Sequence, residues 1–466
     1  MQIPILNGIY ADNGPDLRTS YPVNLVPVPK QSGISAGFLR PGDGIVGNGT
    51  GPGIDRGGIN WNGICYRVMG TKLVTVASDG AVTVLGDVGG PVNTLVTMDY
   101  SFDRLAIASG GRLYYWNGVL TQVTDPDLGI VLDVVWVDGY FMTTDGTSLV
   151  VTELSDPTQV NPLKYGSSEV DPDPVVALLK LRNEVYALNR NTIEVFDNVG
   201  GEFFPFQRID GAQIQKGVIG TFGCCVFVES VAFLGSGRNE APGIYLGANA
   251  TAQKISTQEI DQILLGYTEV QLAGVKLEAR NDKAHQHLYV HLPDRTLVFD
   301  AAATGELSQP VWFTLTTSQA GFSQYRARNL VWAYDKWLIG DPQSNAIGYL
   351  VDNISSHWGQ IVRWEFGTLI VYNESNGAIF NELELVSLTG SVAIGVDPMI
   401  STSYSVDGKA WSQDRSIRAG TTGSRKRLAW FQQGHMRNWR IQRFRGDSQA
   451  HLSFIRLEAQ IEPLAY

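Results

Sequence analysis

The sequence has few cysteines, and their placement excludes two common ways of stabilising a fold. Cys65, Cys224 and Cys225 are the three present, and two of them are adjacent. An odd count without regular ligand spacing argues against a disulfide framework and against a zinc site. We therefore expect three reduced, mostly buried thiols in a protein that folds in cytoplasm.

Long hydrophobic runs and a secretion signal are also lacking. The first residues, MQIPILNGIYADNGPD, have neither the basic start nor the apolar centre of a signal peptide. No stretch approaches about 18 uninterrupted apolar residues, so we expect no membrane-spanning segment. Charged residues make up only 17%, and the net charge is −11. Such an acidic protein is poorly suited to wrapping DNA, although it could line a passage through which DNA slides.

The motifs of several enzyme classes are missing as well. The sequence has no H-E-x-x-H and no P-loop. The glycine-rich stretch 41–58 neither follows a good strand nor opens a helix, so we interpret it as a flexible loop. SYSVDGKAW, from Ser403 to Trp411, is one residue short of a sialidase-type Asp-box. A hairpin turn at Asp407-Gly408 explains it, and we expect no catalytic residue and no cofactor.

Glycine and short apolar runs are abundant instead. Fifty-one residues are glycine, and from residue 61 to 351 short β-type runs alternate with turns such as Asp79-Gly80 and Asp145-Gly146. Seven such runs recur with a mean spacing of about 45 residues, the length of a four-stranded propeller blade. They begin at Tyr66, Arg112, Tyr140, Val185, Val231, Leu288 and Trp337. This pattern predicts a β-propeller of six or seven blades over residues 61–351.

The other parts of the chain have different sequence patterns. Residues 1–60 contain alternating prolines and apolar residues, which predicts an extended N-terminal arm. Residues 352–466 contain longer alternating strands such as LSFIRLEAQIE, which predicts a C-terminal β-sandwich of jelly-roll type. Ser256 and Glu259 form an S-x-x-E capping box before Ile260, which predicts one short helix inserted in the propeller. The fold class is therefore all-β, with three parts.

Three histidines are the only candidate metal ligands that we single out. His285, His287 and His291 lie in AHQHLYVHLPD and would share one face of a strand. A zinc site needs a closed set of ligands, and no cysteine or acidic cluster in the neighbouring sequence completes one. We interpret the three as a polar strand face or an interface and expect no metal.

The sharpest physical feature is a basic segment near the C-terminus. Between Arg415 and Arg445 there are nine basic residues and no acidic ones, so the remainder of the chain carries −20, since the whole carries −11. Trp430, Phe431 and Trp439 interleave with the arginines, a combination that suits protein interfaces and stacking on nucleic acid. Because the remainder is acidic, we favour docking of a protein partner over DNA contact or a merely solvated face. The candidate docking residues, here called the basic stripe, are Arg425, Lys426, Arg427, Arg437, Arg440, Arg443 and Arg445.

Several stretches resemble the nozzle, or tail hub, proteins of Salmonella-type short-tailed bacteriophages. The clearest is QKGVIGTFGCCVFVESVAFLGSGRNEAPGIYL, from Gln215 to Leu246. KISTQEIDQIL and LYVHLPDRTLVFDA follow it, and PVNLVPVPK, FLRPG and DRGG precede it. ELELVSLTG and the SYSVDGKAW turn are similar near the end of the chain. The resemblance spans nearly the whole chain in the same order, and no single motif in it is chemically diagnostic.

This resemblance implies a structural virion protein and not an enzyme. Proteins of this family assemble as a homohexameric ring below the portal and its adaptor, where they continue the DNA channel and stabilise packaged DNA. They also carry tailspikes and the tail needle or plug. The resemblance thus implies synthesis in the host bacterial cytoplasm, localisation in the phage tail, and DNA that passes through the lumen without sequence-specific binding.

Two other functions remain open at this point. A carbohydrate-binding or glycoside-cleaving propeller could use exposed aromatic side chains, and Trp332, Tyr334 and Trp337 are candidates for stacking on sugars. Their spacing fits strand packing equally well. A propeller scaffold with no phage role is the second alternative, because propellers present many turns on a stiff framework.

Overall fold

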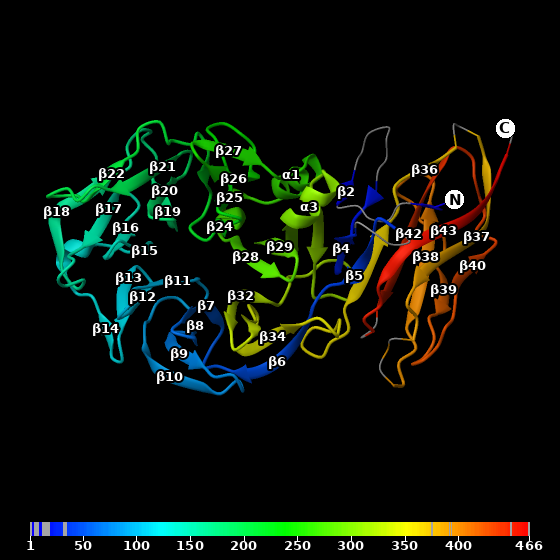
Figure 1. Cartoon of the computed structure of the whole chain (residues 1–466), viewed down its shortest axis with the longest axis horizontal. Coiled ribbons are helices and arrows are strands. Elements are labelled where there is room, and N and C mark those ends of the chain that lie inside the picture. Colours follow the sequence, from blue (N-terminus) through cyan, green and yellow to red (C-terminus); the bar gives the residue numbers. More distant parts are fainter. Residues whose placement is uncertain are drawn as a thin grey trace.

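The computed structural model describes residues 2–3, 9–11, 19–30, 35–373, 376–390, 392, 394–447 and 450–464. It consists of a ring of small antiparallel sheets beside a two-sheet sandwich (Figure 1). The helices within the described residues are short, and none is both long and apolar enough to cross a membrane. The predicted combination of a β-propeller and a C-terminal β-sandwich is confirmed.

Seven blades form the propeller from the described residues, each a sheet whose strands mostly follow one another along the chain. Blade 1 contains β7 (Asp55–Trp61), β8 (Ile64–Met69), β9 (Lys72–Val76) and β10 (Val82–Asp87). Blade 2 contains β11 (Thr97–Tyr100), β12 (Leu105–Ser109), β13 (Arg112–Trp116) and β14 (Leu120–Gln122). Blade 3 contains β15 (Asp133–Val137), β16 (Tyr140–Thr144), β17 (Ser148–Thr152) and β18 (Val160–Ser167).

The remaining blades continue the ring in the same direction (Figure 1). Blade 4 contains β19 (Val175–Leu181), β20 (Glu184–Asn189), β21 (Ile193–Asn198) and β22 (Phe206–Arg208). Blade 5 contains β23 (Gly217–Val218), β24 (Cys224–Phe227), β25 (Ser230–Ser236), β26 (Gly243–Ala248) and β27 (Thr251–Lys254). Blade 6 contains β28 (Lys276–Asp282), β29 (His285–His291), β30 (Thr296–Asp300) and β31 (Trp312–Leu315). Blade 7 contains β32 (Arg328–Ala333), β33 (Lys336–Gly340) and β34 (Ala346–Val351), with a fourth strand from elsewhere in the chain.

That fourth strand closes the ring. It is β6 (Gly44–Thr50), which pairs antiparallel with β34 although some 300 residues separate them. The expectation of a flexible loop over 41–58 is therefore wrong, because this stretch contains β6 and the first residues of β7. Its glycines are needed for close approach: a side chain at Gly49 would begin 2.3 Å from the carbonyl oxygen of Gly80. The many glycines, which are also typical of loops, here allow β6 to pack closely against the turn at Gly80.

Tight turns and buried apolar side chains explain the blades. Asp138 and Gly139 both have positive φ between β15 and β16, as a two-residue hairpin turn requires. The predicted turn at Asp145-Gly146 is confirmed, and its Asp145 Oδ1 accepts hydrogen bonds from the backbone of Thr147 and Ser148 at 2.8 and 2.7 Å. The apolar faces of adjacent blades pack against each other and form a series of separate core clusters around the ring.

Three short α-helices lie at blades 5 and 6, namely α1 (Gln258–Leu265), α2 (Glu269–Ala273) and α3 (Ala301–Leu307). The expected helix is present as α1, but the expected capping box is wrong. Its N-cap is Thr257, and the Ser256 hydroxyl instead donates to Asp261 at 2.7 Å and accepts from Ile244 N–H. A capping box does form at α2, between Thr268 and Gln271. A single-turn 3-10 helix, η1 (Pro126–Leu128), precedes blade 3.

Two sheets form the sandwich. The first has the order β4 (Leu25–Pro29), β5 (Gly37–Pro41), β43 (Phe454–Pro463), β37 (Ala378–Ser387) and β40 (Leu428–Phe431), with β1 (Gln2–Ile3) on β43 and β41 (His435–Met436) on β37. The second has the order β35 (Arg363–Gly367), β42 (Trp439–Asp447), β38 (Met399–Ser405) and β39 (Arg415–Arg418), with β36 (Val371–Tyr372) on β42. Aromatic residues from both sheets, including Trp364, Phe366 and Phe454, pack in its core.

The first sixty residues connect the two parts. This stretch was expected to be an extended arm, but most of its strands belong to the two parts of the fold. β4 and β5 lie in the first sandwich sheet, β6 closes the propeller and β7 begins blade 1. β2 (Tyr10–Ala11) and β3 (Thr19–Ser20) form a small separate hairpin. Asn24 ties the parts together, because its side-chain amide donates to Thr316 O at 3.0 Å and to Arg363 O at 2.7 Å. Residues 1, 4–8, 12–18 and 31–34 of the expected arm lie outside the described residues.

Candidate functional site

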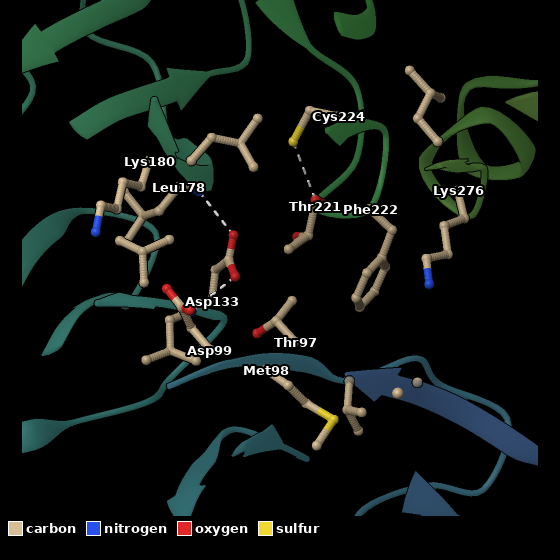
Figure 2. A pocket seen from close by; sticks show the side chains of 17 residues that line it. Thr97, Met98, Asp99, Asp133, Leu178, Lys180, Thr221, Phe222, Cys224 and Lys276 are labelled. Atoms are coloured by element: carbon tan, nitrogen blue, oxygen red, sulfur yellow. Dashed lines mark hydrogen bonds between the residues drawn. The ribbon is translucent and has the colours of Figure 1, made fainter. Parts of the chain in front are cut away.

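A pocket lies at the hub of the propeller, where the innermost strands of several blades meet (Figure 2). Its wall includes the first strands of blades 1, 2, 3, 4 and 6 and a loop and strand of blade 5. The charged groups at this wall are Asp99, Asp133, Lys180 and Lys276. A pocket with two carboxylates and two amines could support catalysis only if these groups were free to react, and the partners of each group decide this.

The carboxylates fasten one blade to the next. Asp133 of blade 3 accepts a hydrogen bond from the backbone of Leu178 in blade 4 at 2.8 Å (Figure 2). Asp99 of blade 2 does the same with Trp136 of blade 3 at 2.6 Å. Because these carboxylates satisfy backbone N–H groups between blades, they are structural groups and not a free acid–base pair.

Glu278 repeats this arrangement farther round the ring. Its two carboxylate oxygens accept from the backbone of Asn329 at 3.0 Å and of Leu330 at 3.1 Å, both in blade 7. Lys276 forms an ion pair with Glu278 at 2.9 Å. The ammonium of Lys180 lies 4.6 Å from the ring centre of Trp136. The groups at the hub thus have partners within the propeller and give no reason to infer a reaction there.

Asp133 makes the hub sensitive to pH. Burial raises its pKa to about 7, whereas an unfolded chain has a carboxyl pKa of about 3.9. Below about pH 4 the Asp133 carboxyl is protonated in both the folded and the unfolded state, and its contribution to the free energy of unfolding is at its maximum. Between about pH 4 and 7 only the unfolded state ionises, so we expect this contribution to fall by about 1.4 kcal/mol per pH unit and to level off above about pH 7.

Denaturant unfolding of the wild type and of Asp133→Asn across this range tests the expectation. The free energy of unfolding of Asp133→Asn should improve relative to that of the wild type as the pH rises from 4.5 to about 7, because the variant has no carboxyl to ionise. Two curves that stay parallel would show that Asp133 does not titrate in this range.

The three candidate histidines divide into two groups. His291 has partners on both ring nitrogens, since its Nε2 lies 3.0 Å from Glu278 and its Nδ1 lies 3.0 Å from Thr296. His285 and His287 instead approach Asp300, which lies opposite His287 on β30. Sequence reasoning missed Asp300 because it is 13 positions farther along the chain and only strand pairing brings it close.

The structure disperses the basic stripe. Arg440 lies in the sandwich interior and is fully buried, with its guanidinium between the rings of Phe380 and Tyr404 at 4.3 and 3.9 Å. It donates to Gln433 O at 2.6 Å and to Gln442 Oε1 at 2.8 Å. Arg440 therefore cannot belong to a docking surface, and its role is to fill and crosslink the core.

Three other members of the stripe are paired on the sandwich surface. Arg427 donates to both Glu382 and Glu384 at 2.9 Å. Arg443 packs against the Trp411 ring at 4.1 Å, and Arg445 forms an ion pair with Asp414. Acidic residues outside the basic segment thus neutralise part of its charge.

The last three members remain exposed. Arg425 and Lys426 lie in the turn before β40, and Arg437 follows β41. No ion pair to any of the three is found among the described residues. These residues are the part of the predicted stripe that is available to a partner.

The aromatic residues considered for sugar binding serve strand packing. Trp332 and Trp337 are direct cross-strand partners in blade 7, with ring centres 5.3 Å apart. The Tyr334 hydroxyl donates to Val76 O at 3.0 Å in blade 1. The turn predicted at Asp407-Gly408 is confirmed, because Asp407 Oδ1 accepts from Lys409 and Ala410 N–H at 2.8 and 2.7 Å.

The sequence reasoning also missed two buried residues in DRGG, at 55–58. Asp55 pairs with Arg67 at 2.9 Å and accepts from the Asn329 amide at 2.6 Å, which joins blade 1 to blade 7. Arg56 donates to Gly70 O, Gly89 O and Thr94 O at 3.0, 2.8 and 2.6 Å. Asp55 therefore holds the region where the ring closes, whereas Arg56 fastens blade 1 to the connection that leads to blade 2.

Comparison with known proteins agrees with this two-part architecture. Residues 1–355 match the family model described as bacteriophage P22 Gp10, β-propeller, and residues 363–462 match the one described as bacteriophage P22 Gp10, β-sandwich. The chain belongs to the bacteriophage P22 Gp10 family. The two matches meet between β34 and β35, where the propeller ends and the sandwich begins. The suspected resemblance to tail hub proteins of Salmonella-type phages is confirmed.

A curated relative is similar over almost its full length. The protein named tail hub protein gp10, from Salmonella phage P22, is 28% identical over an aligned length of 462 residues. The match covers 94% of this chain and 94% of that protein. Among solved structures, the Neurospora crassa Pan2 WD40 domain has a TM-score of 0.42 at 9% identity, covering 66% of this chain and 95% of that one. The N-terminal domain of Nup159 has a TM-score of 0.41 at 9% identity, covering 69% and 98%. Similarity this low has no bearing on function.

Proposed function

We propose that this chain is a structural component of the tail hub of a short-tailed bacteriophage and has no catalytic role. One observation carries the proposal: the chain and the tail hub protein of Salmonella phage P22 share 28% identity across 94% of both sequences. Both parts of the fold are included in that match, so the similarity is not confined to a common propeller.

In this role the chain forms a ring, a homohexamer, below the portal and its adaptor. The ring continues the DNA channel, holds packaged DNA in the head, and provides attachment sites for tailspikes and the tail needle. The net charge of −11 supports passage of DNA without tight binding, because an acidic lumen repels phosphates. The chain is made in the host cytoplasm and resides in the virion.

We further propose that the exposed part of the basic stripe docks a partner in the tail. Arg425, Lys426 and Arg437 extend from the sandwich, and the chain outside the basic segment carries −20. A neighbouring subunit of the same chain would therefore offer a surface of opposite charge. Exposed charges at an interface raise the association rate and contribute modestly to affinity.

Binding to DNA-filled heads that lack this chain tests both statements. The purified wild-type chain should bind such heads, and Arg425→Ala/Lys426→Ala should bind roughly two- to tenfold more weakly, with a smaller difference at high salt. Arg112→Ala/Lys409→Ala removes the same charge from exposed positions elsewhere and should bind like the wild type. Failure of the wild type to bind would contradict the hub role. Equal binding by both double variants would contradict only the docking role of the stripe.

A further inference from the structure

Two histidines and one aspartate converge at one end of the two central strands of blade 6. His285 and His287 are alternate residues of β29, so both side chains lie on one face, and Asp300 is the last residue of β30. His285 Nδ1 lies 2.5 Å and His287 Nε2 lies 3.4 Å from Asp300 Oδ2. One nitrogen of each ring and this oxygen lie within 4.8 Å of one another.

His287 is buried without hydrogen bonds. Its side chain is 2% exposed, its Nδ1 has no hydrogen-bond partner among the described residues, and its Nε2 has only the 3.4 Å contact with Asp300 Oδ2, whose geometry falls short of a hydrogen bond. A buried polar group without a partner is rare in native proteins and points to a missing ligand.

Asp300 is oriented so that one oxygen faces the histidines. It is the N-cap of α3, where its Oδ1 accepts from Ala303 N–H at 3.2 Å. Oδ2 is thereby left to the two rings. A hydrogen bond that fixes a ligating carboxylate in this way is typical of metal sites.

The surrounding charges permit a cation. Arg280 lies opposite His287 on β28, and its guanidinium pairs with Asp43 at 2.7 Å and with Asp282 at 3.5 Å. Its positive charge is therefore compensated. The Asp300 carboxylate remains as an additional negative charge beside the two imidazole rings.

We propose that His285 Nδ1, His287 Nε2 and Asp300 Oδ2 bind one divalent transition metal ion of the Zn²⁺ class. Zinc bonds to nitrogen and oxygen are about 2.0–2.2 Å, so tetrahedral ligands lie roughly 3.3 Å apart. The three atoms already lie within 4.8 Å of one another, which is close to this spacing. Three protein ligands leave one position for water next to His285, the most exposed of the three. The ion would clamp α3 to β29 and β30. From the sequence alone we expected no metal here, because Asp300 was not identified as a third ligand.

Metal binding by the untagged full-length chain tests the proposal. The chain is stripped with EDTA and titrated with Zn²⁺ by calorimetry, and bound metal is counted by elemental analysis. We expect one Zn²⁺ per chain, a higher unfolding temperature with Zn²⁺, and visible Co²⁺ absorption of a four- or five-coordinate site. Asp300→Asn, which can still cap α3, and His285→Gln should each bind Zn²⁺ at least about tenfold more weakly.

A matched control separates this site from the other histidines. His435 is exposed on β41, so His435→Gln should keep the wild-type affinity and stoichiometry. In EDTA, Asp300→Asn should unfold at nearly the same temperature as the wild type, which shows that the loss of affinity is not a loss of fold. Absence of stoichiometric binding in the wild type would overturn the proposal, as would wild-type affinity in Asp300→Asn. Neither result would affect the proposed hub role.

Discussion

Replacing Asp55 with alanine is expected to lower the free energy of unfolding by about 3–5 kcal/mol. Asp55 and Arg67 form an ion pair at 2.9 Å whose side chains are 1% and 0% exposed. Without the carboxylate, the Arg67 guanidinium is buried without a countercharge, and the amide of Asn329 loses its acceptor. The contact that is lost joins blades 1 and 7, where the ring closes. Denaturant unfolding followed by tryptophan fluorescence measures the loss.

Two further variants identify the cause. Asp210→Ala removes an exposed carboxylate and should change the free energy of unfolding by less than about 0.5 kcal/mol. Asp55→Leu/Arg67→Met replaces the pair with apolar side chains and should regain much of the loss, because no charge is then buried alone. A loss below about 1 kcal/mol in Asp55→Ala would mean that the pair is hydrated in solution.

Replacing Phe454 with alanine should destabilise the sandwich by about 3–5 kcal/mol. The side chain is fully buried, with its ring centre 4.6 Å from that of Trp364 and 5.6 Å from that of Phe366. Its backbone also pairs with Leu39 of β5. We therefore expect a lower unfolding temperature together with faster amide hydrogen exchange in Gly37–Pro41.

Phe431→Ala is the matched control for this prediction. Phe431 lies on β40 of the same sheet, but its side chain is 60% exposed. Its truncation should cost less than about 1 kcal/mol and leave the exchange of β5 unchanged. Similar losses in the two variants would contradict the assigned sandwich core.

The sequence revealed the parts of the fold that depend on local pattern. Short apolar runs separated by turns such as Asp145-Gly146 predicted the propeller, because each blade is built from consecutive hairpins. The closure of the ring was not predictable in the same way. β6 pairs with a strand about 300 residues away, and its glycines, which allow that approach, have the composition of a loop.

The candidate sites depend even more on distant contacts. Nine basic residues without an acidic one predicted a charged surface, but Arg440 points into the core and Arg427 meets glutamates of β37. Strand alternation decides which arginine faces inward, and the register was unknown from the sequence. In the same way, Asp300 joins the histidines only through the pairing of β29 with β30.

The most direct test of the proposed hub role is to delete the gene from the phage that carries it and follow the DNA inside heads by nuclease protection over time. We predict that heads fill normally and then lose protected DNA, and that adding the purified chain stops the loss. Heads that keep their DNA and form complete tails without this chain would contradict the account.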